Sequence, residues 1–238
     1  MDSVKERFNR TEALLGKQAM ERLYNSKVAI FGVGGVGGYA AEVIARSGIG
    51  YIDIFDSDSV SATNINRQIY ALTSTIGQYK VDVAKKRIED INPDCIVKTY
   101  KVFYLPSNAD QIDLSKYDYV VDCIDTVVAK VELVVRCNKQ NIPIISSMGA
   151  GNKLDATAFK VSDISKTKID PLAKAVRKRL RKLGVEHLKV VYSEEVPNMT
   201  SCQSTELMPA SNSFVPGVAG LIIGGEVIKD IIHCTNLL

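Results

Sequence analysis

The chain alternates short apolar runs with longer segments in which apolar residues recur at helical spacing. Apolar runs over residues 28–31, 51–55 and 119–121 are each followed by a polar or glycine-rich turn, which predicts buried strands. Stretches 95–104 and 142–146 predict two more strands. Residues between these runs have the spacing of amphipathic helices.

Two of these helices are expected over residues 77–91 and 127–140, with short helices before the first strand. Strands that alternate with helices in this rhythm predict an α/β fold with a doubly wound, mostly parallel sheet.

The C-terminal part of the chain has a less regular pattern. Residues 156–162 suggest a strand, and residues 217–232 a closing helix. Between them, Asp170 and Pro171 open a helix over 170–183, since an acidic N-cap followed by proline is a typical helix start.

A glycine-rich turn follows the first predicted strand. Gly32 allows a sharp turn off the strand, Gly34 lets backbone N–H groups approach a phosphate, and Gly37 lets the next helix pack close to the sheet. Asp56, 19 residues after Gly37, stands at the end of the second strand, where a carboxylate meets ribose hydroxyls. A nucleotide site is therefore favoured over a purely steric role, although the motif does not name the nucleotide.

No low-complexity linker divides the chain. We therefore predict one domain over residues 1–238, with a Rossmann-like nucleotide-binding half over 1–150 and an irregular C-terminal extension over 151–238.

Further candidates follow the ends of other strands and should share one edge of the sheet. Asn64 and Arg67 lie in a polar loop after the second strand, and Lys80 lies in the first turn of a helix. A lysine there is either simply exposed or explained by a nearby anion, since cations prefer the other helix end. Asp125 either caps the next helix or holds Mg2+ on a phosphate.

Together these residues indicate which nucleotide chemistry to expect. Arg67, Lys80 and Asp125 supply a guanidinium, an ammonium and a metal-holding carboxylate, which suit cleavage of a triphosphate during carboxylate adenylation. Hydride transfer with NAD has little use for so many cations and stays as an alternative. No Walker lysine is present, so an ordinary phosphate-loop ATPase is not expected.

Composition and charge indicate the class of protein and its cellular compartment. The chain has 238 residues, 46% of them hydrophobic, and a net charge of +3, which is typical of an ordinary globular protein. Its five cysteines include no CxxC pair, which argues against a zinc site and a disulfide framework and fits a reducing cytoplasm. Charged residues interrupt the apolar stretch 215–232, so no membrane span is expected.

The helix over 170–183 is strongly basic. Such a helix is a solvated face, a membrane-surface helix or a reader of phosphate backbones, and beside a nucleotide enzyme we favour RNA. The candidate RNA-binding cations are Lys174, Arg177, Lys178, Arg179, Arg181 and Lys182.

These motifs resemble the adenylating domain of the ThiF/MoeB/ubiquitin-activating superfamily. The resemblance covers about residues 5 to 150 and is carried by five motifs: Gly32-x-Gly34-Gly35-x-Gly37, Asp56-x-Asp58, Asn64-x-x-Arg67-Gln68, Gly77-Gln78-x-Lys80-Val81 and Asp122-Cys123-x-Asp125.

The resemblance implies ATP with Mg2+ as cofactors. It places Asp56 on the ribose, Arg67 and Lys80 on the phosphates, and Asp125 on the metal. It adds Gly35, Asp58 and Gln68 to the nucleotide-binding set and implies a homodimer in which Arg10 reaches into the partner's site.

Nearly the whole chain is also similar to the tRNA threonylcarbamoyladenosine dehydratase family, through residues 165–172 and the basic helix after them. This similarity implies a tRNA substrate, adenylation of its threonyl carboxylate and intramolecular ring closure with net loss of water. Cysteine-desulfurase or sulfur-acceptor proteins are possible partners. Internal attack needs no enzyme nucleophile, and Cys202, in a polar loop, is most often incidental. The alternative is a ThiF- or MoeB-type activator of a ubiquitin-like sulfur carrier.

Overall fold

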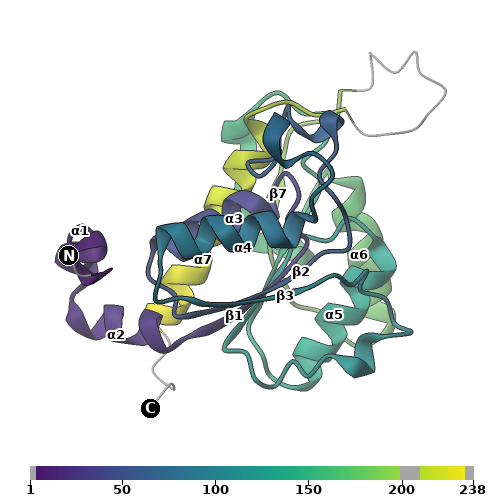
Figure 1. Ribbon diagram of the computed structural model, residues 1–238. Coiled ribbons are helices and arrows are strands. Elements are labelled where there is room, and N and C mark those ends of the chain that lie inside the picture. The colour runs from purple at the N-terminus through teal and green to yellow at the C-terminus, as the bar shows by residue number, and fades with distance from the viewer. Residues whose placement is uncertain (1–3, 199–209, 234–238) are drawn as a thin grey trace.

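The computed structural model describes residues 4–198 and 210–233 (Figure 1). The strands of its sheet are β1 (Lys27–Phe31), β2 (Tyr51–Phe55), β3 (Ile96–Tyr100), β4 (Tyr119–Asp122), β5 (Ile144–Ser147), β6 (Phe159–Asp163) and β7 (Lys189–Ser193). The α-helices are α1 (Asn9–Leu15), α2 (Lys17–Asn25), α3 (Gly37–Arg46), α4 (Lys80–Ile91), α5 (Val127–Lys139), α6 (Pro171–Lys182) and α7 (Val215–His233).

The seven strands form one sheet in the order β3-β2-β1-β4-β5-β7-β6. Neighbouring strands run parallel, except that β6 runs antiparallel to β7. The strand order reverses between β1 and β4, which is the pattern of a doubly wound sheet. The predicted fold class is confirmed.

Helices cover both faces of the sheet. Figure 1 shows α3, α4 and α7 over one face and α5 and α6 over the other. The strands of a parallel sheet buried on both faces are expected to be almost wholly apolar. Accordingly, residues 28–31 of β1 and all of β4 are buried.

The closing helix α7 packs closely on α3, the helix that follows the glycine-rich turn. A Cβ on Gly220 would lie 2.2 Å from the carbonyl oxygen of Val36, and one on Gly224 would lie 2.6 Å from Val43 Cβ. Glycine at these positions therefore lets the two helix backbones approach each other. No helix among residues 4–198 and 210–233 is apolar over a membrane-spanning length.

The C-terminal part is more regular than the sequence suggested. β6 and β7 extend the sheet, and β7 was not predicted. The strand expected over 156–162 begins only at Phe159, because residues 156–158 form a 3-10 turn. The strand expected over 95–104 is shorter, since β3 pairs with β2 only as far as Tyr100.

The start of α6 agrees with its sequence signature. The Asp170 carboxylate accepts a hydrogen bond from the Ala173 N–H at 2.8 Å, and Pro171 takes the first helical position. The predicted helix start is confirmed, and the helix ends at Lys182.

Candidate active site

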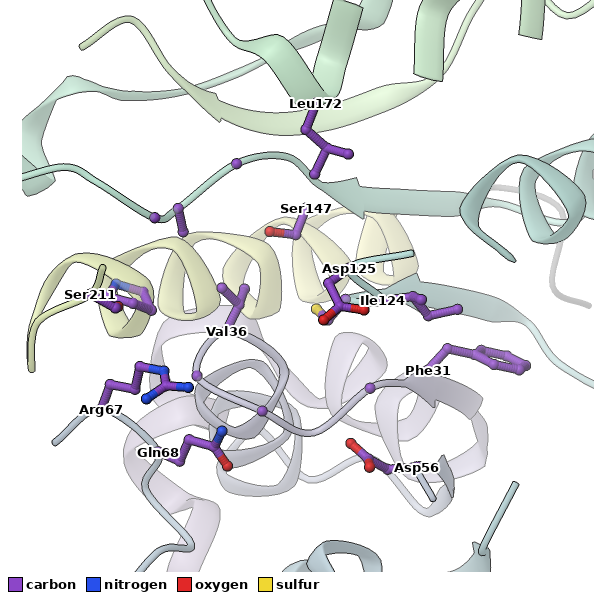
Figure 2. Close-up of a pocket in the computed structure, with 18 of the residues that line it drawn as sticks. Phe31, Val36, Asp56, Arg67, Gln68, Ile124, Asp125, Ser147, Leu172 and Ser211 are labelled. Carbon is purple, nitrogen blue, oxygen red and sulfur yellow. The ribbon is translucent and has the colours of Figure 1, made fainter. Parts of the chain in front are cut away.

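A cavity of about 790 Å3 opens where β1, β2, β4 and β5 end (Figure 2). This is the edge at which open parallel sheets bind ligands, at the point where strand order reverses. The cavity is lined by all the predicted nucleotide-binding residues except Gly37, namely Gly32, Gly34, Gly35, Asp56, Asp58, Asn64, Arg67, Gln68, Lys80 and Asp125.

Gly32, Gly34 and Gly37 of the glycine-rich turn serve different structural purposes. Gly32 has a φ of +85°, which favours glycine, and a Cβ on Gly37 would lie 1.9 Å from the carbonyl oxygen of Gly32. Around Gly34 the nearest atom to an added Cβ is 3.7 Å away, on the Gln68 side chain. Gly32 and Gly37 are therefore required by the backbone conformation and packing. At Gly34 the missing side chain instead leaves room for a ligand to approach the backbone.

Asp56 joins the end of β2 to the glycine-rich turn. Its Oδ2 accepts a hydrogen bond from the Val33 N–H and its Oδ1 accepts one from the Asp58 N–H, each at 2.9 Å. Burial raises the pKa of the Asp56 carboxyl, while these two N–H groups and the nearby Lys80 act in the opposite direction. The carboxylate is thus fixed at the edge of the cavity.

Lys80 is paired with an anionic side chain of the same chain, which explains the presence of a cation at the first position of α4. Its Nζ lies 2.6 Å from Asp58 Oδ2. The lysine side chain is 7% exposed, but the Asp58 side chain is 61% exposed. The Lys80 ammonium therefore lies in the cavity wall, and its partner carboxylate, Asp58, is accessible to solvent.

The loop between β2 and α4 positions three polar side chains. Asn64 is buried, and its Oδ1 accepts a hydrogen bond from the Ser61 N–H at 3.1 Å. Its carbonyl oxygen accepts bonds from the N–H groups of Arg67 and Gln68 at 3.1 Å and 2.9 Å. Arg67 Nη1 in turn donates to the Thr63 carbonyl oxygen at 2.9 Å. Figure 2 shows Arg67 and Gln68 on the same side of the cavity as Asp56.

Asp125 lies exposed in the loop that follows β4. Its Oδ1 accepts a hydrogen bond from the Thr126 hydroxyl at 3.1 Å. The N-cap of α5 is Thr126, and no side chain caps that helix. The helix-capping alternative for Asp125 is thus excluded, and its carboxylate faces the cavity.

A buried ion pair that was not predicted from the sequence supports this loop. Lys130 Nζ lies 2.9 Å from Asp122 Oδ2, and both side chains are fully buried. The Ser146 hydroxyl also donates to that carboxylate. Asp122 Oδ1 accepts the Ile124 N–H at 3.1 Å, which fixes the chain just before Asp125. A lysine on a helix normally indicates a solvent-facing position. The burial of Lys130 is therefore recognised only from its pairing with Asp122 on β4.

The opposite wall of the cavity comes from Ser147 at the end of β5, from residues 148–153 after it and from Asp170–Leu172 at the start of α6. Figure 2 shows Ser147 and Leu172 across the cavity from Arg67 and Gln68. Sequence reasoning assigned no ligand role to this wall. The available signal was the pair Gly149 and Gly151 directly after a strand.

The cations of α6 divide into two groups. Arg177 is partly buried, and its Nη1 donates to the carbonyl oxygens of Ile164 and Thr167 at 3.1 Å and 2.9 Å. It anchors α6 to the segment before it, and its contact with RNA stays a prediction. The exposed cations are Lys174, Lys178, Arg179, Arg181 and Lys182.

Arg10 lies on α1, which projects from the body of the molecule (Figure 1). It is exposed and does not line the cavity of its own chain. The neighbouring Arg7 Nη1 donates to the Asp90 carbonyl oxygen at 3.1 Å and connects this segment to the end of α4.

The cysteines that the structure describes have raised pKa values, and the described residues contain no preformed cluster of metal ligands. Burial raises the pKa of Cys95, Cys123 and Cys137 to about 12, so these thiols are protonated at neutral pH. Cys202 lies outside the described residues. Within residues 4–198 and 210–233 no three His, Cys, Asp or Glu side chains gather as a metal site.

Known proteins are similar in sequence to this chain over most of its length. The model of the ThiF family matches residues 8–237. The chain belongs to the ThiF family. This ThiF-family chain is 47% identical over 239 residues to the tRNA threonylcarbamoyladenosine dehydratase of Bacillus subtilis (strain 168), with 94% of each chain covered. It is 41% identical over 180 residues to the enzyme of the same name from Escherichia coli (strain K12), covering 76% of this chain and 67% of that one.

Solved structures agree with the family assignment. The crystal structure of the E. coli dehydratase in complex with ATP superimposes on this ThiF-family chain with a TM-score of 0.90 at 34% identity, covering 98% of this chain and 96% of that one. The same protein in complex with AMP gives a TM-score of 0.89.

The buried pair beneath Asp125 makes a testable contribution to stability. Lys130→Met would leave the Asp122 carboxylate buried without a counter-ion, so we expect the free energy of unfolding to fall by about 3–5 kcal/mol. Urea denaturation measures this change. Adding Asp122→Asn removes the uncompensated charge and should recover part of the loss.

Lys85→Met is the matched control. Lys85 forms an exposed pair with Glu89 at 3.6 Å, and such surface pairs contribute about 0–1 kcal/mol. Equal losses in Lys130→Met and Lys85→Met would contradict a supporting role for the buried pair.

Proposed function

We propose that the protein catalyses ATP-dependent dehydration of threonylcarbamoyladenosine in tRNA, by adenylation of the threonyl carboxylate and intramolecular ring closure. The observation that carries this proposal is the single cavity in which Asp56, Arg67, Lys80 and Asp125 meet beside the glycine-rich turn. The similarity to dehydratases over nearly the full chain supports the choice of substrate.

ATP would occupy the wall formed by the glycine-rich turn and the loop after β2. Asp56 would receive the ribose hydroxyls, and the N–H groups near Gly34 would approach the phosphates. Arg67 and Lys80 would stabilise the charge that develops on the α-phosphate and the departing pyrophosphate.

The first chemical step joins the carboxylate to AMP. A carboxylate oxygen attacks the α-phosphorus, an O–P bond forms, and pyrophosphate leaves with the electrons of the broken P–O bond. An internal nucleophile of the same substituent then attacks the acyl carbon, AMP leaves, and the nucleophile loses its proton. The high thiol pKa values near the sheet support this route, since it needs no enzyme nucleophile.

We also propose Mg2+ as the metal that accompanies ATP. Mg2+ is usually held by one or two carboxylates and by substrate phosphates, with water as the remaining ligand. The exposed Asp125 carboxylate fits that demand, because one of its oxygens is used only by a hydroxyl and it caps no helix. When bound, the metal would neutralise phosphate charge. We expect no zinc.

The protein would act in the cytoplasm, where its tRNA substrate is found, and cysteine-desulfurase or sulfur-acceptor proteins are candidate partners. Activation of a ubiquitin-like sulfur carrier is the alternative. The adenylyltransferase and sulfurtransferase proteins among the relatives of this chain are matched over only about a third of their own length, 32% in one case.

A nucleoside assay tests the proposed reaction. The protein is incubated with ATP, Mg2+ and threonylcarbamoylated tRNA, and the digested nucleosides are analysed by mass spectrometry. We expect the modified nucleoside to lose one water, and Lys80→Ala to lower the rate by at least about tenfold because a phosphate contact is lost. An unchanged nucleoside, together with pyrophosphate exchange that requires a Gly-Gly-ended protein, would instead favour the sulfur-carrier alternative.

The exposed cations of α6 are proposed as the tRNA-binding surface. Replacing Lys178, Arg179 and Arg181 with Ala should weaken tRNA binding and reduce the slope of log K against log salt by up to about 3, roughly one per lost phosphate contact. ATP affinity should be retained. Filter binding at several salt concentrations measures the slope.

The matched control for this surface replaces Lys17, Lys86 and Lys98, which are exposed on α2, α4 and β3. It removes the same charge elsewhere, so we expect a much smaller change of slope. Equal slopes for the two triple variants would count against α6 as the RNA-binding surface.

Arg10 is proposed to act in the partner's site of a homodimer. Its exposure on a projecting helix, away from the cavity of its own chain, supports this arrangement. Arg10→Ala and Lys80→Ala should each be nearly inactive, whereas a mixture of the two proteins should regain activity. In a mixed dimer one site contains both an intact Lys80 and an intact Arg10. A mixture as inactive as its components would argue that Arg10 does not act in trans.

A further inference from the structure

The loop after β5 presents unused hydrogen-bond donors to the cavity. Gly149, Ala150 and Gly151 all line the cavity, and Ala150 and Gly151 are partly exposed. Within the part of the chain that the structure describes, the backbone N–H groups of Ala150 and Gly151 reach no acceptor. The absence of large side chains leaves room for a ligand to approach these N–H groups.

A buried ion pair fixes one end of this loop. Lys153 Nζ donates to the carbonyl oxygen of Gly149 at 2.8 Å, and Asp170 Oδ2 accepts the Gly149 N–H at 3.0 Å. The two side chains are 1% and 0% exposed and lie 3.5 Å apart. Lysine and aspartate thus hold both polar groups of Gly149. A Cβ on this glycine would lie 3.1 Å from Asp170 Oδ2, which is tighter than ordinary contact.

The other end of the loop is fixed by backbone contacts of Asn152. This residue has a φ of +58°, its N–H donates to the Ala210 carbonyl oxygen at 2.7 Å, and its own carbonyl oxygen accepts the Asn198 N–H at 2.7 Å. A short loop held at both ends keeps its two free N–H groups in place before a ligand arrives. Donors arranged in advance stabilise an anion without a cost of reorganisation during the reaction.

We propose that the N–H groups of Ala150 and Gly151 form the binding site for the substrate's carboxylate, with Lys153 and Asp170 as positioning residues. This inference rests on the proposed function. The loop lies across the cavity from Arg67 and the glycine-rich turn, so an acyl group bound here would face the ATP half (Figure 2). Asp170 also caps α6, so the same carboxylate connects the acyl site to the basic helix.

The two donors would serve both chemical steps. While one carboxylate oxygen attacks the α-phosphorus and pyrophosphate departs, the other oxygen stays on the N–H groups and becomes the acyl oxygen of the adenylate. When the internal nucleophile attacks the acyl carbon, negative charge develops on that same oxygen before AMP leaves. The donors then stabilise the developing oxyanion.

Ala150→Pro removes one donor, because proline has no backbone N–H. Ala150→Val is its matched control, since valine has similar bulk and keeps the N–H. We expect Ala150→Pro to lower kcat/KM for threonylcarbamoylated tRNA by about ten- to a hundredfold relative to Ala150→Val, the value of a hydrogen bond to a charged group. The Kd for ATP, measured by calorimetry, should stay within about twofold of wild type.

A second pair of variants leaves the donors unchanged and tests the support of Gly149. Lys153→Met with Asp170→Asn removes both charges while Asn keeps an acceptor for the helix cap. Lys153→Gln with Asp170→Asn differs only in restoring a donor toward the Gly149 carbonyl oxygen. We expect a lower kcat for the methionine variant, partial rescue by the glutamine variant, and unchanged ATP affinity for both.

Three results have distinct meanings. Equal kcat/KM for Ala150→Pro and Ala150→Val would overturn the carboxylate site. A parallel loss of ATP affinity in Ala150→Pro would also overturn it, because the donor would then serve the nucleotide. A wild-type protein that leaves the tRNA nucleoside unchanged would instead overturn the proposed function itself.

Discussion

The backbone contact at the end of β1 is the constraint on which the rest of the site depends. Gly37 begins α3 so close to Gly32 that a methyl group would lie 1.9 Å from the Gly32 carbonyl oxygen. The Cys123 N–H donates to the Phe31 carbonyl oxygen at 2.8 Å and brings the end of β4 to the same point. Because α7 then packs on α3 through Gly220 and Gly224, the closing helix is held against the nucleotide half.

Among the described residues, three lysines are buried and each is paired with an aspartate. Lys80 and Lys153 line the cavity, and Lys130 lies beneath the loop that follows β4. Unpaired charges are costly to bury, so the pairing is expected. The pairs differ in the exposure of the acid: Asp122 and Asp170 are fully buried, whereas 61% of the Asp58 side chain is exposed. An exposed carboxylate can return to water when another anion arrives. Lys80 is therefore the lysine suited to exchange its partner for a phosphate. Lys130 and Lys153 are suited to fix the loops after β4 and β5 in place.

Local patterns predicted what local chemistry determines. The first two strands, the sharp turn at Gly32, the position of Asp56 after β2 and the Asp170 cap were predicted correctly, because each signal lies within a few residues of its effect. Lys130 and Lys153 were missed because their burial depends on aspartates contributed by other elements. β7 was missed because a short strand is recognised by its neighbours in the sheet, and these are distant in sequence.

The position of β7 has a consequence for the order in which the chain folds. Within the part of the chain that the structure describes, β6 pairs with no strand but β7, which follows about thirty residues later and itself joins the sheet through β5. During synthesis β6 must wait without a partner strand until Ser193 has left the ribosome, while β1 to β5 can already pair. The part of the cavity wall that comes from Asp170–Leu172 lies between these two strands in sequence, and it is thus among the last parts of the cavity to be assembled.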